Sequence, residues 1–481
     1  MEEYNSISDT IMESSRATPV VLSRRNLAAI LLTTCLSSFA TPYISSGVQI
    51  ALPVIAAEYG ISATLIGWVP TAFLIPYAIF LLPFGKIADT WGRRRIFLGG
   101  TATMAAGIAI AGLAPDFWFI LAGMTVAGFG SAMTFATSVP LLTTNYPLRE
   151  RGKVIGINTA VVYIGLSSGP FIGGILTDAF GWRALYLVAV PAALAALAAG
   201  VLFVPRDTGL RQEQGLRFDA TGTAVYAAGL LLLILGASRL PAFWAFALVI
   251  AGTAGIAGFL IWEGRAVNPI FPVRTFVGNR PFTYSNIAAL INYSSTYAIT
   301  FLLSMYLYYI QGFSPAAAGT VLVAQPVMMA VMTPIAGRLS DRIEPRLLAT
   351  TGMAIVAAGL FALAFIGWDT PVAAIAGILL FLGFGYGAFS SPNMNSIMSS
   401  VADSRAGIAS ATAGTMRVLG QIASMAIAMT AFSVLIGTVV ISPEVADELL
   451  RAISASFVVF GCLCTAGIWF SYARGDLRAK G

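Results

Sequence analysis

Long apolar runs, separated by short polar segments, occupy most of the 481-residue chain. A helix needs about 20 mostly apolar residues to cross the ~30 Å hydrocarbon core of a bilayer. No run has the pattern of a strand, and a lipid-embedded backbone must be helical or form a closed barrel. The pattern therefore predicts an all-α polytopic membrane protein with fourteen helices, at residues 27–57, 63–84, 96–114, 117–139, 154–178, 184–204, 221–238, 241–262, 283–309, 316–337, 347–366, 371–398, 407–436 and 450–473.

The composition supports a membrane protein and excludes several other classes. Hydrophobic residues make up 58% of the chain, charged residues 10%, and histidine is absent. A soluble domain carries about 25% charged residues. The net charge of +6 is spread over short loops, which argues against a nucleic-acid partner. Without histidine or paired acids inside the spans, neither an enzyme nor a metal or other cofactor is expected.

The positions of the basic residues predict the orientation. Most of the 27 lysines and arginines fall in loops on one side of the predicted helices, whereas Arg183, Arg239 and Arg451 fall on the other. Because cytoplasmic loops are enriched in lysine and arginine, both termini are expected on the cytoplasmic side of the cell membrane. The polar first 26 residues do not resemble a cleavable signal peptide, so the first apolar run is expected to stay in the membrane.

Two short segments repeat along the chain and indicate two related halves. Residues 85–89 read GKIAD after the second predicted helix, and residues 337–341 read GRLSD after the tenth. Duplicated halves around a central site are typical of secondary transporters. The expected organisation is a tail at 1–26, a six-helix half at 27–204, a linker with two extra helices at 205–282, a six-helix half at 283–473, and a tail at 474–481.

Residues 85–95, GKIADTWGRRR, contain the strongest motif. Taken alone, such a segment is also compatible with a plain basic turn between helices. It agrees position by position with the signature of the major facilitator superfamily, which the whole chain resembles. The resemblance implies two six-helix halves and a cytoplasmic gate that braces them when the inner side is closed. It assigns to this gate Gly85, Asp89, Gly92 and Arg93, with Gly337, Asp341 and Arg342 in the second half.

Glycines at every fourth position form a second motif in the fifth predicted helix. A face without side chains allows another helix to approach closely, so ordinary packing explains the pattern as well. With its embedded Gly-Pro, the segment resembles the antiporter motif of exporters in this superfamily, which implies outward transport. The motif comprises Gly165, Gly169, Pro170, Gly173 and Gly174.

The fourteen helices and several loop segments resemble the fourteen-span drug–proton antiporter branch, but its charged residues are missing. Ile44 occupies the place of the usual acid in the first helix. Met124 and Ala127 replace an arginine and a glutamine in the fourth helix. Losing the acid and the base together avoids a buried unpaired charge. Proton coupling is therefore left open, with Glu58, Asp178 and Asp89 as the candidate acids near the membrane surfaces.

The remaining candidates for a substrate cavity are mostly neutral. An asparagine or glutamine in a membrane-spanning helix forms a hydrogen bond to another helix about as often as it contacts a ligand. Arg417 lies about ten residues into its helix, ~15 Å deep, where a charge needs a partner. Either backbone carbonyls and amides such as Gln421 satisfy it, or an anionic group does. The candidates are Gln49, Trp68, Tyr77, Asn158, Tyr163, Asn292, Tyr293, Gln325, Asn393 and Arg417.

Three functions fit these observations. The leading hypothesis is an exporter of amphipathic organic compounds that works by alternating access. The second is a facilitator or exchanger of small organic anions or metabolites, which the missing acids and the single buried arginine favour. The third, a non-transporting sensor, would need a soluble domain that the short polar segments do not provide. The expected partners are a small-molecule substrate, the lipid bilayer and a coupling ion, with the chain acting as a monomer.

Overall fold

The computed structural model describes residues 23–205, 219–266, 271, 273–340, 342–402, 406–437, 439–441 and 443–475. In this part of the chain, fourteen helices are long and apolar enough to cross a membrane. This confirms the expected all-α polytopic membrane fold, and most helix bounds lie within a few residues of the sequence prediction. The tail at 1–22, the segment 206–218 and Asp341 lie outside the described residues, so the predictions made for them stay predictions.

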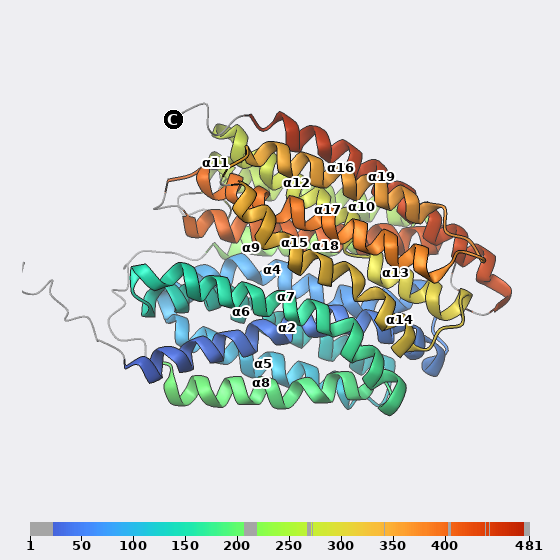
Figure 1. Ribbon diagram of the computed structural model, residues 1–481, viewed down its shortest axis with the longest axis horizontal. Helices are drawn as coiled ribbons and strands as arrows, with labels where there is room; N and C mark the ends of the chain where they lie inside the picture. Colours follow the sequence, from blue (N-terminus) through green and yellow to red (C-terminus); the bar gives the residue numbers. More distant parts are fainter. Residues whose placement is uncertain are drawn as a thin grey trace, which may run out of the picture.

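The first six spans pack into one half of the molecule, drawn in blue to green in Figure 1. Local signals in the sequence set the helix ends. Ser23 caps the first helix by accepting a hydrogen bond from the Asn26 amide, and Asp116 caps another in the same way. The helices are α2 (Arg24–Tyr59), the short α3 (Ala63–Ile66) followed by α4 (Trp68–Trp91), α5 (Arg93–Gly112), α6 (Phe117–Asn145), α7 (Leu148–Phe180) and α8 (Arg183–Phe203).

The last six spans form the second half, drawn in yellow to red (Figure 1). Two of these spans consist of consecutive helical segments rather than one uninterrupted helix. The segments are α12 (Arg280–Thr296), α13 (Ile299–Met305) and the π-helical η1 (Tyr306–Ile310) in one span, α14 (Pro315–Leu322) and α15 (Ala324–Ser340) in the next, then α16 (Pro345–Ala364), α17 (Val372–Ser399), α18 (Ala406–Leu435) and α19 (Ala446–Ala473), with the short η3 (Pro443–Val445) before the last.

Between the halves the chain forms the extra hairpin, α9 (Ala220–Ala237) and α10 (Phe243–Arg265), followed by the short α11 (Val273–Gly278). Glycines allow its two helices to pack closely, since a Cβ at Gly229 would lie 3.0 Å from the Ile256 amide nitrogen. The hairpin lies against α4 of the first half and α18 of the second. Thr430 and Ser433 of α18 donate hydrogen bonds to the carbonyl oxygens of Ala237 and Leu240.

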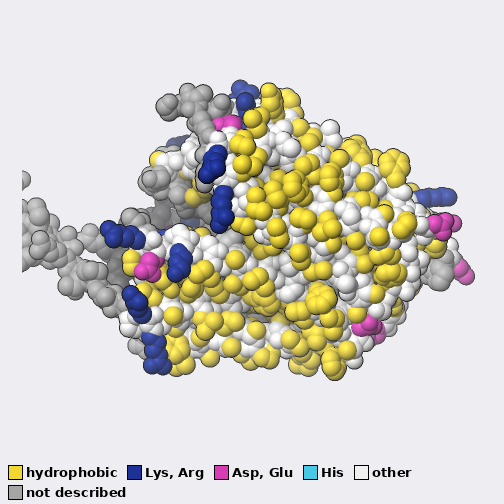
Figure 2. All heavy atoms as spheres, viewed as in Figure 1, with side chains coloured by type: hydrophobic (Ala, Val, Ile, Leu, Met, Phe, Trp, Pro, Cys, Tyr) yellow, Lys and Arg dark blue, Asp and Glu magenta, His cyan; other side chains and the backbone are white. Residues whose placement is uncertain are grey.

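The two ends of the helix bundle differ in charge. We call the end that holds Arg24 of α2 and Arg474 after α19 the tail end, and the other the opposite end. Figure 2 shows lysines and arginines gathered at the tail end, on the left, and hydrophobic side chains spread over the surface between the ends. Arg183, Arg239 and Arg451 lie at the opposite end. The apolar belt is the surface that lipid would cover.

Candidate functional site

The two halves are closed against each other toward the opposite end. The Ser45 and Tyr297 hydroxyls lie 2.9 Å apart. Ser304 donates a hydrogen bond to the Gln49 carbonyl oxygen, at 2.8 Å, and Tyr309 donates one to Pro53, at 3.2 Å. These contacts join α2 to the second half, and we call this region the opposite gate.

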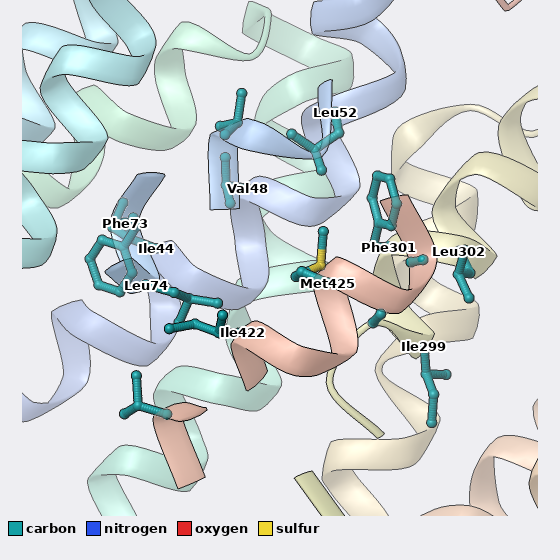
Figure 3. Packing of buried hydrophobic residues seen from close by; sticks show 14 of the residues in the cluster. Ile44, Val48, Leu52, Phe73, Leu74, Ile299, Phe301, Leu302, Ile422 and Met425 are labelled. Atoms are coloured by element: carbon teal, nitrogen blue, oxygen red, sulfur yellow. The ribbon is translucent and has the colours of Figure 1, made fainter. Parts of the chain in front are cut away.

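Apolar side chains fill the space beside these hydrogen bonds. In Figure 3, α2, α4, α13 and α18 meet in one cluster that contains residues from both halves. Ile44, at the position where the related branch has an acid, is 1% exposed within this cluster. An ionised carboxylate here would lose its hydration, and the cluster offers it no cation. The labelled members are Ile44, Val48, Leu52, Phe73, Leu74, Ile299, Phe301, Leu302, Ile422 and Met425.

The glycine motif of α7 has two different packing faces. Gly165, Gly169 and Gly173 face α2 of the same half, where a Cβ at Gly165 would lie 2.6 Å from the Phe39 carbonyl oxygen. Gly174 instead faces the second half, where a Cβ would overlap the carbonyl oxygen of Pro315. From the other side, a Cβ on Gly319 of α14 would overlap the carbonyl oxygen of Pro170. One segment therefore packs within its half and also seals the opposite gate.

We expect Gly174→Ala to shift the protein toward a state that is open at the opposite end. The added methyl group clashes with backbone, which cannot rotate away, so the closed arrangement of α7 and α14 loses stability. Spin labels at Phe180 and Phe365, both exposed at this end, would report a longer distance between the halves. Gly156→Ala is the control, because a Cβ there meets no atom within 4 Å. An unchanged distance distribution in Gly174→Ala would contradict the assignment.

Toward the tail end, a cavity of about 100 Å³ leads to Arg417. Its walls come chiefly from α12, α17 and α18 of the second half, and Phe135 of α6 closes one side. The residues around it run along α17 and α18 from Arg417 toward the tail end, so the cavity lies on that side of the arginine. They are Phe135, Ala289, Tyr293, Phe389, Ser390, Asn393, Met394, Ile397, Ser410, Ala413, Gly414 and Arg417.

Arg417 is surrounded by aromatic rings from both halves. Its guanidinium carbon lies 4.8 Å from the centre of the Phe135 ring, and its Nη2 atom lies 3.5 Å from the Tyr77 hydroxyl. Tyr293 and Tyr386 are close enough to interact with its charge. No carboxylate of the described residues forms an ion pair with it. From the sequence, Gln421 or backbone carbonyl oxygens were also candidates to accept hydrogen bonds from Arg417. Arg417 makes no such hydrogen bond within the described chain.

The structure brings half of the predicted cavity residues together. Tyr77, Tyr293, Asn393 and Arg417 lie at the cavity or beside it, and the Tyr163 hydroxyl interacts with Ser390 and Thr333 across the two halves. The other five lie elsewhere. Gln49 belongs to the opposite gate, Trp68 begins α4 at the opposite end, and the buried Asn158, Asn292 and Gln325 do not line the cavity.

Sequence reasoning missed several residues of the cavity wall, among them Phe389 and Ser390 of α17. They lie three and four residues after Tyr386 and four and three residues before the predicted Asn393, so the four residues share one face of the helix. That spacing of aromatic and polar residues was the available signal. Phe135 had no comparable signal, because its role depends on how α6 approaches α18.

Asn393 also takes part in a buried network at the tail end. Arg474, which the sequence had placed in the C-terminal tail, is 1% exposed. It donates hydrogen bonds to Asn393 Oδ1 at 2.9 Å and to Ser285 Oγ at 3.2 Å, and two more to Ser471. Burial lowers the pKa of Arg474 to about 9, so it remains charged at neutral pH. The network joins α12, α17 and α19.

Asp89 and Arg93 of the predicted gate motif at 85–95 contact their own half in this conformation. Asp89 accepts two hydrogen bonds from Arg93, at 2.9 and 3.0 Å, and Arg93 also donates to Thr144 of α6. Gly92 has φ 104°, a conformation that glycine adopts readily, and it turns the chain from α4 into α5. A Cβ at Gly85 would meet nothing within 4 Å. In the second half, Gly337 lies against Ser391.

A charged cluster that was not predicted lies beside this motif. Glu263, near the end of α10, is 1% exposed and accepts a hydrogen bond from the Phe271 amide at 3.0 Å. Asp219 accepts one from the Trp262 indole at 2.8 Å. Both acids interact with the charge of Lys86, on α4. The extra hairpin is thus attached to the segment that carries the gate motif.

Comparisons with known proteins agree with this architecture. A sequence model of the Major Facilitator Superfamily matches residues 34–425 and again 286–476. The chain is 30% identical to the riboflavin transporter RibZ of Clostridioides difficile, over 81% of this chain and 84% of that one. It is 31% identical to the cephamycin export protein CmcT of Amycolatopsis lactamdurans, over 83% and 84%. With the multidrug resistance protein Stp of Mycobacterium tuberculosis the identity is 27%, over 79% and 71%.

Solved structures share the fold at low sequence identity. A bacterial homologue of the lysosomal transporter Spinster, in an inward-facing and unoccupied conformation, superposes with a TM-score of 0.64 at 18% identity, covering 94% of this chain and 96% of that one. An auto-inhibited peptide transporter of the POT family gives 0.67 at 15% identity, covering 94% and 97%.

Proposed function

Because the chain belongs to the Major Facilitator Superfamily and is therefore a membrane transporter, we propose that it exports amphipathic organic compounds by alternating access between its two halves. The observation that carries this proposal is the asymmetry of the pathway. A cavity leads from the tail end to Arg417, while the opposite gate is closed by α2, α7, α13 and α14. The names of two relatives, a cephamycin exporter and a multidrug resistance protein, support the outward direction and the substrate class.

The proposal places the tail end in the cytoplasm of a cell membrane, with the protein acting as a monomer. The basic residues gathered at the tail end support this orientation. The cavity would then face the cytoplasm, from which an exporter takes its cargo. Each half contributes side chains to the surroundings of Arg417, so a single chain provides the whole pathway.

We expect single cysteines to reveal this orientation in a background without Cys35, Cys462 and Cys464. In intact cells, a membrane-impermeant maleimide should label a cysteine at the exposed Asp369, at the opposite end, but not one at the exposed Glu150, at the tail end. Permeabilised cells provide the control, because both positions should then react. Labelling of Glu150→Cys in intact cells would reverse the topology.

Proteoliposomes test the transport function directly. Riboflavin, a cephamycin and the lipophilic dye ethidium serve as probes, and uptake is followed with and without a pH gradient and with excess unlabelled compound on the far side. If export is driven by protons, a probe should accumulate in the vesicles, and this accumulation should collapse when the pH gradient is removed. Failure of all three probes to move faster than in protein-free vesicles would contradict the proposal.

The second candidate is a facilitator or exchanger of small organic anions that is not proton-driven. The buried Ile44 supports it, because the position where the related branch has an acid cannot carry a proton here. The paired state of Glu58, which accepts hydrogen bonds from Trp182 at 2.6 Å and Arg183 at 2.8 Å, supports it as well. The same vesicles separate the two candidates, since an exchanger is stimulated by compound on the far side and not by the pH gradient.

A further inference from the structure

Within the described part of the chain, no carboxylate pairs with the charge of Arg417. A guanidinium has five N–H donors and stays protonated in proteins. Among the described residues, Arg417 makes one hydrogen bond, to the Tyr77 hydroxyl at 3.5 Å, which is at the long limit for such a bond. A charge in the middle of a membrane protein is costly unless a partner is present. The neighbours of Arg417 therefore solvate it only in part.

The aromatic neighbours explain how the arginine persists without an acid. The Phe135 ring faces the guanidinium at 4.8 Å, and the negative face of an aromatic ring attracts a cation. Such contacts favour the charge but do not use its N–H donors, which are suited to the two oxygens of a carboxylate. The donors remain available to a ligand in the cavity that Arg417 lines.

The cavity walls show what the rest of such a ligand would contact. Phe135, Tyr293 and Phe389 line the cavity beside Arg417, and the Tyr293 and Tyr386 rings lie 5.6 Å apart in an edge-to-face arrangement. Flat aromatic compounds pack well against such rings. The polar groups here, Ser390, Asn393 and Ser410, are neutral, so Arg417 is the one charged residue among those that line the cavity.

We propose that this cavity binds an aromatic carboxylate, with the carboxylate on Arg417 and the ring among Phe135, Tyr293 and Phe389. The inference rests on the proposed transport function and names its substrate class. Arg417 belongs to the second half, whereas Tyr77 and Phe135 belong to the first. A bound anion therefore neutralises a charge at the junction of the halves, and the loaded protein can close around it without burying a bare cation.

Matched pairs of ligands test the proposal on the purified full-length protein. The probes are benzoate, 2-naphthoate and 9-anthroate, each compared at neutral pH with its uncharged amide by calorimetry. We expect at least one carboxylate to bind about tenfold or more tightly than its amide, because charge-assisted hydrogen bonds to arginine are strong. Equal binding within all three pairs, or no binding of any carboxylate, would overturn the proposal without the need for a variant.

Variants locate the effect. Arg417→Gln should abolish the preference for the acid over its amide, and Arg417→Lys should keep part of it, because lysine retains the charge but not the planar fork. Arg95→Gln, a matched change at an exposed position of the tail end, should leave the preference intact. A preference that survives Arg417→Gln would contradict the assignment. If the carboxylates bind but the protein moves no compound in vesicles, the result contradicts the transport function and still supports the binding site.

Discussion

Gly169→Ile is expected to abolish transport and to lower the stability of the protein by about 3 kcal/mol, the upper part of the range for overpacking a close contact. The α-carbon of Gly169 faces α2 at very short range. A Cβ there would overlap Ser46 Oγ and would lie 2.8 Å from the Gly47 amide nitrogen and 2.9 Å from the Tyr43 carbonyl oxygen. Two of these three atoms are backbone, so α7 must move away from α2 as a whole.

The measurement is thermal unfolding of the purified protein together with uptake in proteoliposomes. Gly156→Ile on the same helix is the control, since its Cβ meets no atom within 4 Å. Gly169→Ala should be milder, and adding Ser46→Ala should recover part of its loss, because the closest clashing atom is removed. Normal melting and normal uptake in Gly169→Ile would show that α2 and α7 are not in close contact.

Arg474→Met is expected to destabilise the second half by about 3 kcal/mol, since it removes the donor from the buried Ser285 Oγ and Asn393 Oδ1, whereas Ser471 Oγ keeps the hydroxyl of Thr350. Asn393→Leu should cost a similar amount by removing the Oδ1 acceptor from a buried cation. The double variant should lose less than the sum of the two, because the residues interact directly. Melting temperature is the readout, and Arg95→Met at an exposed position is the control.

Strict additivity of the two losses would contradict the network. The result also bears on substrate recognition, because Asn393 lines the cavity as well. A transport defect in Asn393→Leu is therefore expected to arise partly from lower stability. Comparing uptake per folded molecule separates the two effects.

The sequence was sufficient to predict the membrane spans, because each needs a long apolar run whose length is set by the bilayer. It was also sufficient to predict the close approach of helices at Gly165 and Gly169, because the periodic glycines leave one helix face without side chains. It was insufficient to predict which residues line the cavity. Gln49 and Asn292 are polar residues in apolar helices just as Tyr293 is, and only the rotation of each helix against its neighbours separates them.

Two misassignments had a clearer physical reason. Arg474 and Glu263 lie just beyond the ends of predicted spans, where charges usually face water. Here neighbouring helices extend past them and bury both. Hydropathy along the chain cannot detect this, because it depends on the relative heights of helices that are far apart in sequence.

The extra hairpin limits how a compound dissolved in lipid can reach the interior. Two halves packed side by side leave two lateral seams between them, one along α4 and α18 and the other along α7, α14 and α15. The hairpin lies over the first seam and is hydrogen-bonded to α18 through Thr430 and Ser433. Among the described residues, nothing comparable lies over the second seam, so compounds that partition into a leaflet are expected to reach the interior from the flank formed by α7 and α15.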